Sequence, residues 1–297
     1  MSYKCIVCTW VVEKYKTQCP MCKQTNSFIL ARKKDVHDFL SGTDVIDMDD
    51  FDDEEMPLEY KRSSVKATDI EDLVIEKIPT GIKSFDESGG VIKGSAHCIT
   101  GDPGVGKTTL LTQACNELAA NRKKVLYAGS EMALPLIKSY AKRLGPWNEW
   151  SDRRFNFLYT DNVQQIINEI EIIQPLFVVV DSLNYIRSLT IDSAANTVPQ
   201  LVACAKLLHE TATKFNCCIY NICHVTKDGD LSGPMAMKHA VDAIWFLKYQ
   251  IDLVQFQKNG VIRYYADGKN RFGTVQGEKL FKMIKETGRL ESYAASI

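Results

Sequence analysis

The feature that most constrains the fold is a complete phosphate-binding loop between a strand-like run, 96–100, and a helix-like run, 109–118. The glycines of such a loop let backbone N–H groups close around phosphates, Lys107 reaches the terminal phosphates, and Thr108 offers its hydroxyl to Mg²⁺. The sequence therefore predicts binding of ATP with Mg²⁺, whereas a glycine-rich turn with a buried lysine is the structural alternative. The expected nucleotide-binding residues are Gly101, Asp102, Pro103, Gly104, Val105, Gly106, Lys107, Thr108 and Thr109.

Two carboxylates follow later strand-like runs. Asp181 comes directly after the apolar run 176–180, where it would orient Mg²⁺ through water. We expect this strand to end side by side with the strand before the loop, because the two would share one ion; an aspartate that only caps a core strand is the structural alternative. Glu131 follows the run 124–128 and could activate the attacking water, or could equally be an acid favoured at a helix N-terminus.

Three polar residues in the second half of the chain also follow strand-like runs. His224 comes after 217–222, where a sensor of the γ-phosphate would lie, although a lone histidine there usually caps structure. Lys269 and Arg271 are two residues apart at a predicted strand end, so both side chains would point the same way. Two cations aimed at one point suit a developing phosphoryl charge, whereas a solvated surface pair is the structural alternative.

The N-terminal region contains two Cys-x-x-Cys pairs, Cys5 with Cys8 and Cys19 with Cys22, separated by ten residues. This spacing predicts four thiolates around a tetrahedral, structural Zn²⁺ that nucleates a module too small to form its own core. Redox-active pairs are the alternative. The other six of the ten cysteines stand in apolar segments, and we expect them to be buried small hydrophobic residues of a protein in a reducing compartment.

Charge is distributed unevenly along the chain. Residues 44–55 hold eight acids and no base, while residues 1–34 hold seven Lys or Arg and one acid. We predict a zinc-binding module at 1–30, a charged, acidic linker at 31–68 and an ATPase domain at 69–297. No run approaches the length of a membrane span and the N-terminus has no apolar signal-peptide core, so we expect no membrane partner and a cytoplasmic location.

From about residue 70 onward, apolar runs alternate with amphipathic stretches. The strand candidates are 96–100, 124–128, 155–159, 176–180, 217–222 and 243–247, and the first four flank helix-like runs. This alternation is typical of an α/β fold with a mostly parallel central sheet covered by helices. Two later runs, 261–266 and 279–284, alternate like antiparallel strands on one edge of that sheet.

These motifs together resemble one family, bacterial RadA, also called Sms, a RecA-like ATPase of branch migration and DNA repair. The resemblance covers the cysteine module and nearly everything from Ile78 to about Ile284. Its marks, besides the cysteines and the phosphate-binding loop, are the segments 80–86 with Gly89-Gly90, 224–227, Gly233-Pro234, Val241-Asp242 and Lys269-Asn-Arg-Phe-Gly273. The resemblance implies a RecA-like P-loop ATPase core.

The resemblance also implies a homo-oligomer, a hexameric ring with ATP bound between subunits. Each site would be completed by the neighbour's Lys269 and Arg271, with Glu131 as the catalytic base, although the family's Gly-Glu-Glu-Ser is Gly129-Ser-Glu-Met132 here. The segments 184–199 and 226–239 would face single-stranded DNA, with Arg187, Lys227 and Lys238 as candidate phosphate contacts. Branched DNA, and a recombinase or replicative helicase, are the further partners implied.

One departure is that family members continue into a Lon-protease-like domain, whereas this sequence ends at Ile297. We therefore expect a short form of the family. Three functions remain open. The first is an ATP-driven DNA motor, a helicase that migrates or unwinds junctions; the second is a RecA-like mediator or annealing protein that coats single strands without unwinding them. The third is a KaiC-like regulatory ATPase that binds proteins, which gives no reason for the basic zinc module.

Overall fold

The computed structural model describes residues 2–7, 11–12, 14–25, 27–31, 67–69, 75–224, 237–252, 257–273 and 277–293. Cys8, Lys227 and most of the predicted linker lie outside the described residues, as does most of the segment 226–239. The chain forms two compact units, Met1–Leu73 and Val74–Ile297. None of the described helices is both long enough and apolar enough to cross a membrane.

The small unit contains a three-stranded antiparallel sheet in the order β2-β1-β3. Its strands are β1 (Ser2–Cys5), β2 (Val11–Val12) and β3 (Phe28–Ala31), and a short 3-10 helix, η3, covers Ala67–Asp69. Phe28 is buried and pairs with Cys5 across the sheet, and Cys19 packs against both. Within the described residues, the buried core of this unit is Phe28 with Cys5 and Cys19, and Tyr3, Val12 and Cys22 pack against it. So small an apolar core is too little for a stable fold without further ligation.

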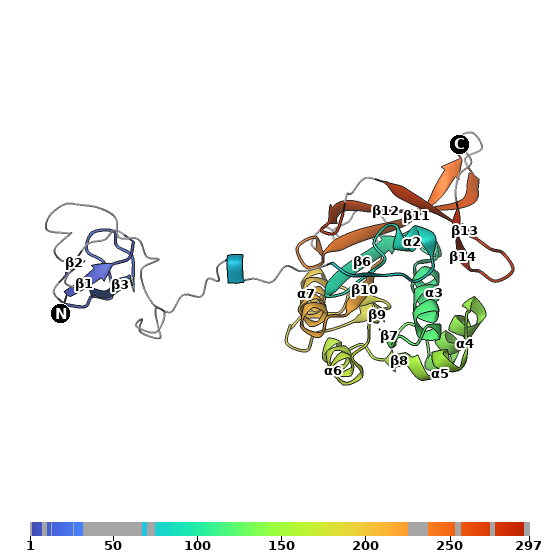
Figure 1. The fold of residues 1–297 in the computed structure, drawn as a ribbon, viewed down its shortest axis with the longest axis horizontal. Coiled ribbons are helices and arrows are strands. Elements are labelled where there is room, and N and C mark those ends of the chain that lie inside the picture. The colour runs from blue at the N-terminus through green and yellow to red at the C-terminus, as the bar shows by residue number, and fades with distance from the viewer. Residues whose placement is uncertain are drawn as a thin grey trace. The chain divides into compact units, whose positions relative to one another are not determined.

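The large unit is built on a sheet that, within the described residues, has nine strands in the order β14-β13-β12-β11-β6-β10-β9-β7-β8 (Figure 1). The strands are β6 (Ser95–Gly101), β7 (Val125–Gly129), β8 (Phe155–Tyr159), β9 (Phe177–Val180), β10 (Cys218–Ile222), β11 (Ala243–Asp252), β12 (Gln257–Asn270), β13 (Glu278–Met283) and β14 (Leu290–Tyr293). A separate hairpin pairs β4 (Lys77–Ile78) with β5 (Val91–Ile92).

The strands from β11 to β8 in this order are mutually parallel, and β12, β13 and β14 add antiparallel partners on one side. Every residue of β6, β7, β9 and β10 is buried, as expected for parallel strands covered on both faces. All six strand candidates of the mostly parallel sheet, and both runs expected to be antiparallel, correspond to strands of the structure. Most bounds agree to within one residue, but β11 ends five residues later than predicted and β12 extends four residues further at each end. The prediction missed β14 and the β4–β5 hairpin.

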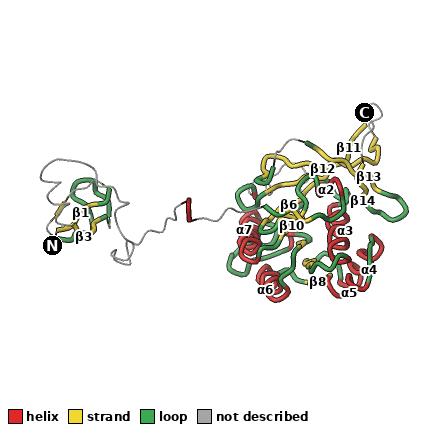
Figure 2. Tube along the Cα trace, viewed as in Figure 1, coloured by secondary structure: helices red, strands yellow, loops and turns green. Residues whose placement is uncertain are grey.

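Helices cover both faces of the sheet (Figures 1 and 2). One face carries α2 (Lys83–Asp86), α3 (Lys107–Ala120), α4 (Leu134–Leu144) and α5 (Glu149–Arg154), and the other carries α6 (Val163–Ile173) and α7 (Val198–Phe215). The alternation of side chains along each strand separates two apolar cores. In β9, for example, Val179 packs with α3 in one core, while Val178 packs with α6 and α7 in the other.

The two ends of the parallel strands present different side chains. At the end that we call the nucleotide end, β6, β7, β9 and β10 finish at Gly101, Gly129, Val180 and Ile222 and pass into the loops that carry the predicted site. At the other end, which we call the distal end, β11 begins at Ala243 and β12 finishes at Asn270 beside it. Loops at the carboxyl ends of parallel strands are where ligands bind in open α/β sheets.

Candidate nucleotide-binding site

The phosphate-binding loop joins the end of β6 to the start of α3 at the nucleotide end of the sheet. Gly101 has a φ of +142°, and a Cβ there would lie 1.8 Å from the carbonyl oxygen of Leu247 in β11. Only glycine fits this close approach. Gly106, directly before α3, has a left-handed conformation that aims the first N–H groups of the helix at the loop.

Lys107 lies folded across this loop. Its Nζ donates to the carbonyl oxygens of Gly101 at 2.8 Å and Asp102 at 3.0 Å, and the residue is buried. Burial lowers the pKa of its ammonium group, while the nearby carboxylates of Asp181 and Asp102 oppose that shift. The cation is thus held at the mouth of the loop by two neutral carbonyls, which an anionic phosphate group can replace as its partner.

Asp181 meets the loop from the end of β9, but β6 and β9 do not end side by side as we expected. β10 lies between them, because it pairs in parallel with both. The contact forms nevertheless, since the Thr108 hydroxyl donates to Asp181 Oδ2 at 2.8 Å across that gap. The Tyr127 hydroxyl donates to the same oxygen.

The second carboxylate oxygen of Asp181, Oδ1, is buried and has no hydrogen-bond partner within the described residues. Burial raises the pKa of this carboxyl, and the hydrogen bonds from Tyr127 and Thr108 offset the rise only in part. A buried oxygen without a donor is costly unless a cation or a water on a cation satisfies it. The hydroxyl of Thr108 and the carboxylate of Asp181 are hard oxygen donors of the kind Mg²⁺ prefers, so this pair fits the ion.

Glu131 lies just past the end of β7, and its Oε1 accepts two hydrogen bonds. The Ser182 hydroxyl donates at 3.0 Å and His224 Nε2 lies 3.1 Å away. The bond from His224 and, next, the bond from Ser182 hold the pKa of Glu131 below its usual range, although partial burial opposes them. Glu131 is therefore ionised at neutral pH, which is the state that can accept a proton from water.

The predicted sensor, His224, thus lies beside the predicted base. It follows β10 directly, and its backbone N–H donates to Asn184 Oδ1 at 2.9 Å. The ends of strands β7 and β9 can approach this closely because residue 129 is a glycine. A Cβ there would lie 1.8 Å from the carbonyl oxygen of Asp181. The structure therefore brings together Lys107, Thr108, Asp181, Glu131 and His224 at the nucleotide end.

Lys269 and Arg271 lie at the distal end, away from this cluster. β11 pairs with β6 at Ala243↔His97 and Leu247↔Gly101, so its first residue is four residues below the start of the phosphate-binding loop, or about 13 Å. Asn270 pairs with Ala243, which fixes the cation pair at that lower level. Neither cation is part of the cluster that the same chain forms around Asp181.

Both cations are held by neighbouring groups. Arg271 Nη1 donates to Asp242 Oδ1 at 2.9 Å, and Arg271 N donates to the Asp242 carbonyl at 3.1 Å. Lys269 Nζ donates to the carbonyl oxygen of Lys238. Burial and the nearby Arg271 lower the pKa of Lys269, while Asp242 opposes the shift.

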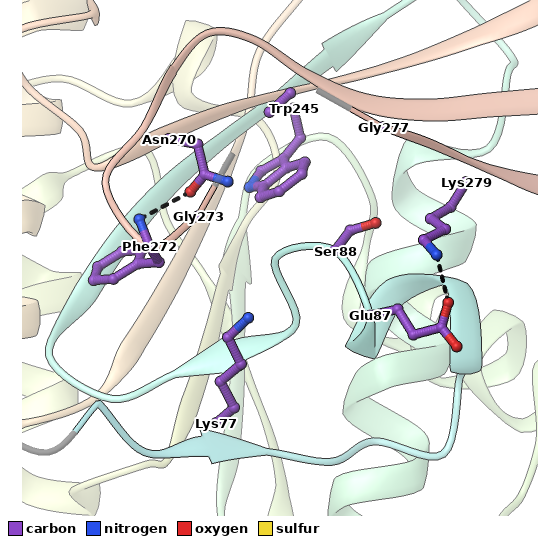
Figure 3. Close-up of a pocket in the computed structure, with 10 residues that line it drawn as sticks. Lys77, Glu87, Ser88, Trp245, Asn270, Phe272, Gly273, Gly277 and Lys279 are labelled. Atoms are coloured by element: carbon purple, nitrogen blue, oxygen red, sulfur yellow. Dashed lines mark hydrogen bonds and ion pairs between the residues drawn. The ribbon is translucent and has the colours of Figure 1, made fainter. Parts of the chain in front are cut away.

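A pocket of about 340 Å³ lies beside the turn that carries Arg271 (Figure 3). Asn270 Oδ1 accepts the backbone N–H of Phe272 at 3.1 Å and tightens that turn, and the ring of Trp245 lies beside Asn270. On the far side of the pocket, Lys279 and Glu87 form an ion pair at 2.6 Å. The turn is thus fixed by its own side chains, so Arg271 leaves the sheet at a defined point.

The candidate DNA contacts within the described residues lie in different surroundings. Arg187 is at the nucleotide end, where its Nη2 forms an ion pair with Asp161 at 2.6 Å. Lys238 is joined to Lys269 through its carbonyl oxygen. A phosphate approaching Arg187 would have to compete with the Asp161 carboxylate, which is itself about half exposed.

A family model described as "AAA domain" matches residues 60–230. The chain belongs to this AAA domain family. The matched range contains every residue that meets at the nucleotide end, from the phosphate-binding loop to His224. Lys269 and Arg271 lie beyond it.

Curated relatives of this AAA-domain chain are named "DNA repair protein RadA". The protein from Streptococcus pyogenes serotype M3 is 30% identical over 288 residues, covering 95% of this chain and 57% of the relative. The Listeria monocytogenes protein is 28% identical over 98% of this chain and 58% of its own length. The Bacillus subtilis protein is 32% identical over 74% of this chain and 46% of its own length. The predicted resemblance to RadA is confirmed, and the chain spans a little over half the length of the first of these relatives.

Two solved structures share the fold of the AAA-domain chain. One, described as an ATPase domain, has a TM-score of 0.60 at 17% identity, covering 74% of this chain and 92% of that one. The other, a KaiC-like protein from Pyrococcus horikoshii, has a TM-score of 0.58 at 16% identity, covering 74% of this chain and all of its own. The predicted RecA-like P-loop ATPase core is confirmed. The family and the fold support an ATPase, that is, a protein that uses a nucleotide together with Mg²⁺ and hydrolyses ATP.

The second candidate site of the AAA-domain chain is the cysteine cluster of the small unit. The sulfur atoms of Cys5, Cys19 and Cys22 all lie within 4.8 Å of one another, and Cys5 and Cys22 are 3.7 Å apart. Three converging thiols in a small antiparallel sheet suit Zn²⁺, which takes thiolate ligands at the corners of a tetrahedron. The fourth predicted ligand, Cys8, falls outside the described residues.

Sequence reasoning missed three polar residues of the nucleotide end. Tyr127 and Ser182 donate to the two carboxylates, and Asn184 bonds the backbone of His224. Tyr127 carried a usable signal, because it is the one side chain with a polar group in its buried strand. Ser182 directly follows Asp181 and Asn184 comes three residues after it. Their partners, Glu131 and His224, lie just past the ends of β7 and β10, so these contacts depend on the strand order.

Proposed function

We propose that this chain is an ATP-dependent DNA motor of the RadA type, which binds single-stranded DNA and drives branch migration or unwinding in recombination and repair. The observation that supports the proposal is that the residues expected to form one phosphoryl-transfer site lie in two separate places. The cluster around Asp181 is at the nucleotide end, whereas Lys269 and Arg271 are at the distal end of the same sheet.

The half-site at the nucleotide end can bind the phosphates and activate water. Among the described residues, Lys107 is the one lysine or arginine in the cluster around Asp181, so the proposal takes a further cation for the γ-phosphate from elsewhere. Backbone N–H groups of the loop and Lys107 bind the phosphates, and Thr108 with Asp181 would hold Mg²⁺, which neutralises charge on the β- and γ-phosphates when bound. Glu131 is ionised and accepts the proton of the attacking water. His224 hydrogen-bonds Glu131 and so lies where it would respond to the γ-phosphate.

The distal cations suit a neighbouring subunit's site better than their own. A head-to-tail ring places the distal face of one subunit against the nucleotide face of the next, so each ATP lies between subunits. There Lys269 and Arg271 would stabilise the charge that develops during phosphoryl transfer. Arg271 keeps its fork of donors outside the sheet because Asp242 occupies only one Nη group in the described contacts.

DNA enters the proposal through the relatives' names and the loop after β9. That loop carries Arg187 and two exposed apolar side chains, Tyr185 and Leu189, which are 52% and 76% exposed. In single-strand binding sites, aromatic rings stack bases and cations bind phosphates, and this loop carries one residue of each kind. The proposal places single-stranded DNA against this loop, in the channel of the ring, with a recombinase or helicase as a further partner.

Steady-state ATP hydrolysis with and without single-stranded DNA tests the DNA part of the proposal. We expect DNA to stimulate the wild-type protein, and Lys107→Ala to give the blank rate under both conditions. A strand-displacement assay on a forked duplex then separates a motor from a protein that only coats single strands. Hydrolysis that ignores DNA, together with no DNA binding, would instead favour a regulatory ATPase that acts on proteins.

A further inference from the structure

Asn184 joins the nucleotide site to the loop that follows β9. It lies in the 3-10 helix η4 (Leu183–Tyr185), two residues after Ser182, and is only 8% exposed. Its Oδ1 accepts the backbone N–H of His224 at 2.9 Å, and its Nδ2 donates to Asn196 Oδ1 at 2.7 Å. One buried amide therefore bridges the residue beside Glu131 and a residue 12 positions further along the chain.

The loop that Asn184 contacts is held together as a unit. Gln200, at the start of α7, accepts the backbone N–H of Ser188 at 2.9 Å, and its Nε2 lies 3.0–3.1 Å from the carbonyl oxygens of Ser188, Ile191 and Ser193. These bonds fix residues 188–193 around one buried side chain. Residues 188–193, which include the exposed Leu189, would therefore move as one unit.

At its Asn184 end the bridge has few ways to relax, although Asn196 at the other end is exposed. Asn184 is buried, so water cannot freely replace a lost partner, and an unsatisfied buried amide is costly. The N–H it binds belongs to His224, whose imidazole is 3.1 Å from Glu131. A displacement of the His224 backbone would therefore act on Asn184 and, through it, on Asn196.

We infer that Asn184 couples the state of the nucleotide to the affinity of the loop 185–197 for single-stranded DNA. The inference rests on the proposed function, because it takes that loop as the DNA contact. Asn184 is a positioning residue here: it touches neither ATP nor DNA, and acts through His224 on one side and Asn196 on the other. Coupling free energies of this kind correspond to about 5- to 150-fold differences in affinity.

The readout is the ratio of two affinities, measured with a fluorescent oligothymidylate and saturating nucleotide. One affinity is measured with a non-hydrolysable ATP analogue and the other with ADP. Asn184→Ala removes both bonds of the bridge. Asn196→Gly removes only the loop-side bond, and glycine readily adopts the φ of +63° found at this position. Asn168→Ala is the matched control, because it deletes an exposed asparagine of α6 that bonds only a glutamine of its own helix in the described contacts.

We define the ratio as the tighter of the two wild-type affinities divided by the weaker one, and we expect it to exceed one. Both bridge variants should bring this ratio closer to one by about fivefold or more, while Asn168→Ala leaves it unchanged. A general loss of structure would weaken DNA binding equally with both nucleotides and leave the ratio intact. A ratio kept within about twofold in both variants, well below the coupling expected, would overturn the inference while leaving the proposed function in place. If the affinity ratio falls in Asn184→Ala but not in Asn196→Gly, the proposed link from Asn184 to the loop would be overturned. A wild-type protein whose affinity does not depend on nucleotide would overturn the proposed function and the inference together.

Discussion

Arg271 is bound to Asp242 at the distal end of the sheet, with Nη1 2.9 Å from Oδ1. Asp242 is itself almost fully buried and also accepts the backbone N–H of Ala96 at 3.0 Å, with His209 Nε2 3.1 Å from its Oδ2. A carboxylate fixed by the central strand thus determines where the guanidinium leaves the sheet. Asp242 therefore positions the cation that we assign to the neighbouring subunit's ATP.

Asp242→Asn should lower turnover more than it lowers stability. The variant keeps the shape of the side chain and one acceptor, but loses the charge-assisted bond to Arg271, which is of the kind worth about 1.5–3 kcal/mol. We expect kcat to fall about tenfold, or ~1.4 kcal/mol in the barrier, with nucleotide affinity unchanged. ATP hydrolysis and thermal melting of the same samples check this. A parallel collapse of Tm would mean that the residue is structural only.

His224→Ala should move the acid limb of the pH–rate profile to higher pH. The hydrogen bond from His224 is the largest cause of the lowered pKa of Glu131, so its removal lets that pKa rise toward the ordinary glutamate range. A base works only when ionised, so activity must then be lost at a higher pH as the solution is acidified. The profile of kcat/KM reports this directly. A variant with a lower rate but an unshifted limb would argue against Glu131 as the base.

The same depressed pKa makes Glu131 a stabilising group. Its contribution to the free energy of unfolding is present above the pKa of Glu131 in the unfolded chain and is lost as pH falls through the lower pKa of the folded state. His224→Ala should reduce that contribution. The difference in Tm between wild type and variant should therefore narrow on acidification.

Asp181→Asn should abolish hydrolysis and yet stabilise the nucleotide-free protein. Burial raises the pKa of this carboxyl, which means that the folded state disfavours its charge at neutral pH. A neutral amide removes that cost and can still accept from Thr108 and Tyr127. We expect Tm to rise, by about 2–4 °C per kcal/mol for a unit of this size. Calorimetry without nucleotide measures the rise, and the loss of Mg²⁺-dependent nucleotide binding measures the functional cost. A lower Tm would contradict the conclusion that the folded protein disfavours the charge of Asp181.

Removal of zinc should unfold the small unit and leave the core of the large unit folded. Cys5, Cys19 and Cys22 supply much of the small unit's interior, so without metal little holds its three strands together. Cys19→Ser or a chelator should release zinc and make residues 1–31 sensitive to protease, while basal ATP hydrolysis persists. Metal analysis of the purified protein gives the stoichiometry. A protein purified without zinc, and with the small unit protease-resistant, would exclude the metal centre.

Much of the fold could be predicted because its strands are buried on both faces. Such strands appear in the sequence as short apolar runs. The runs that form β6 and β9 were the easiest to assign, because the phosphate-binding loop follows the first and Asp181 follows the second. The order of strands is a tertiary property, which is why β10 between β6 and β9 was not expected. The strand β14 was not predicted, because Leu290 is its only buried residue and one apolar position gives no strand pattern.

The positions of site residues could be predicted most completely where the motif itself carries the chemistry. Lys107 and Thr108 are fixed by the loop, so their places follow from the pattern. The partners of Glu131 and Asp181 come from other strands, and no spacing in the sequence indicates that Tyr127 reaches Asp181 or that Ser182 reaches Glu131. Val241-Asp242 was recognised as a family mark, yet its contact with Arg271 appears only once β11 and β12 are paired.

The most direct test of a site shared between subunits mixes two inactive variants. Lys269→Ala keeps an intact nucleotide end, and Lys107→Ala keeps an intact distal end, so a ring containing both has some interfaces with every required group. Random assembly in a head-to-tail ring makes about one quarter of the interfaces complete. We expect hydrolysis approaching that fraction of the wild-type rate. Mixing Lys269→Ala with the double variant Lys107→Ala/Lys269→Ala is the control, because it creates no complete interface. A mixture of the two single variants that is no more active than this control would contradict completion of the ATP site by a neighbouring subunit.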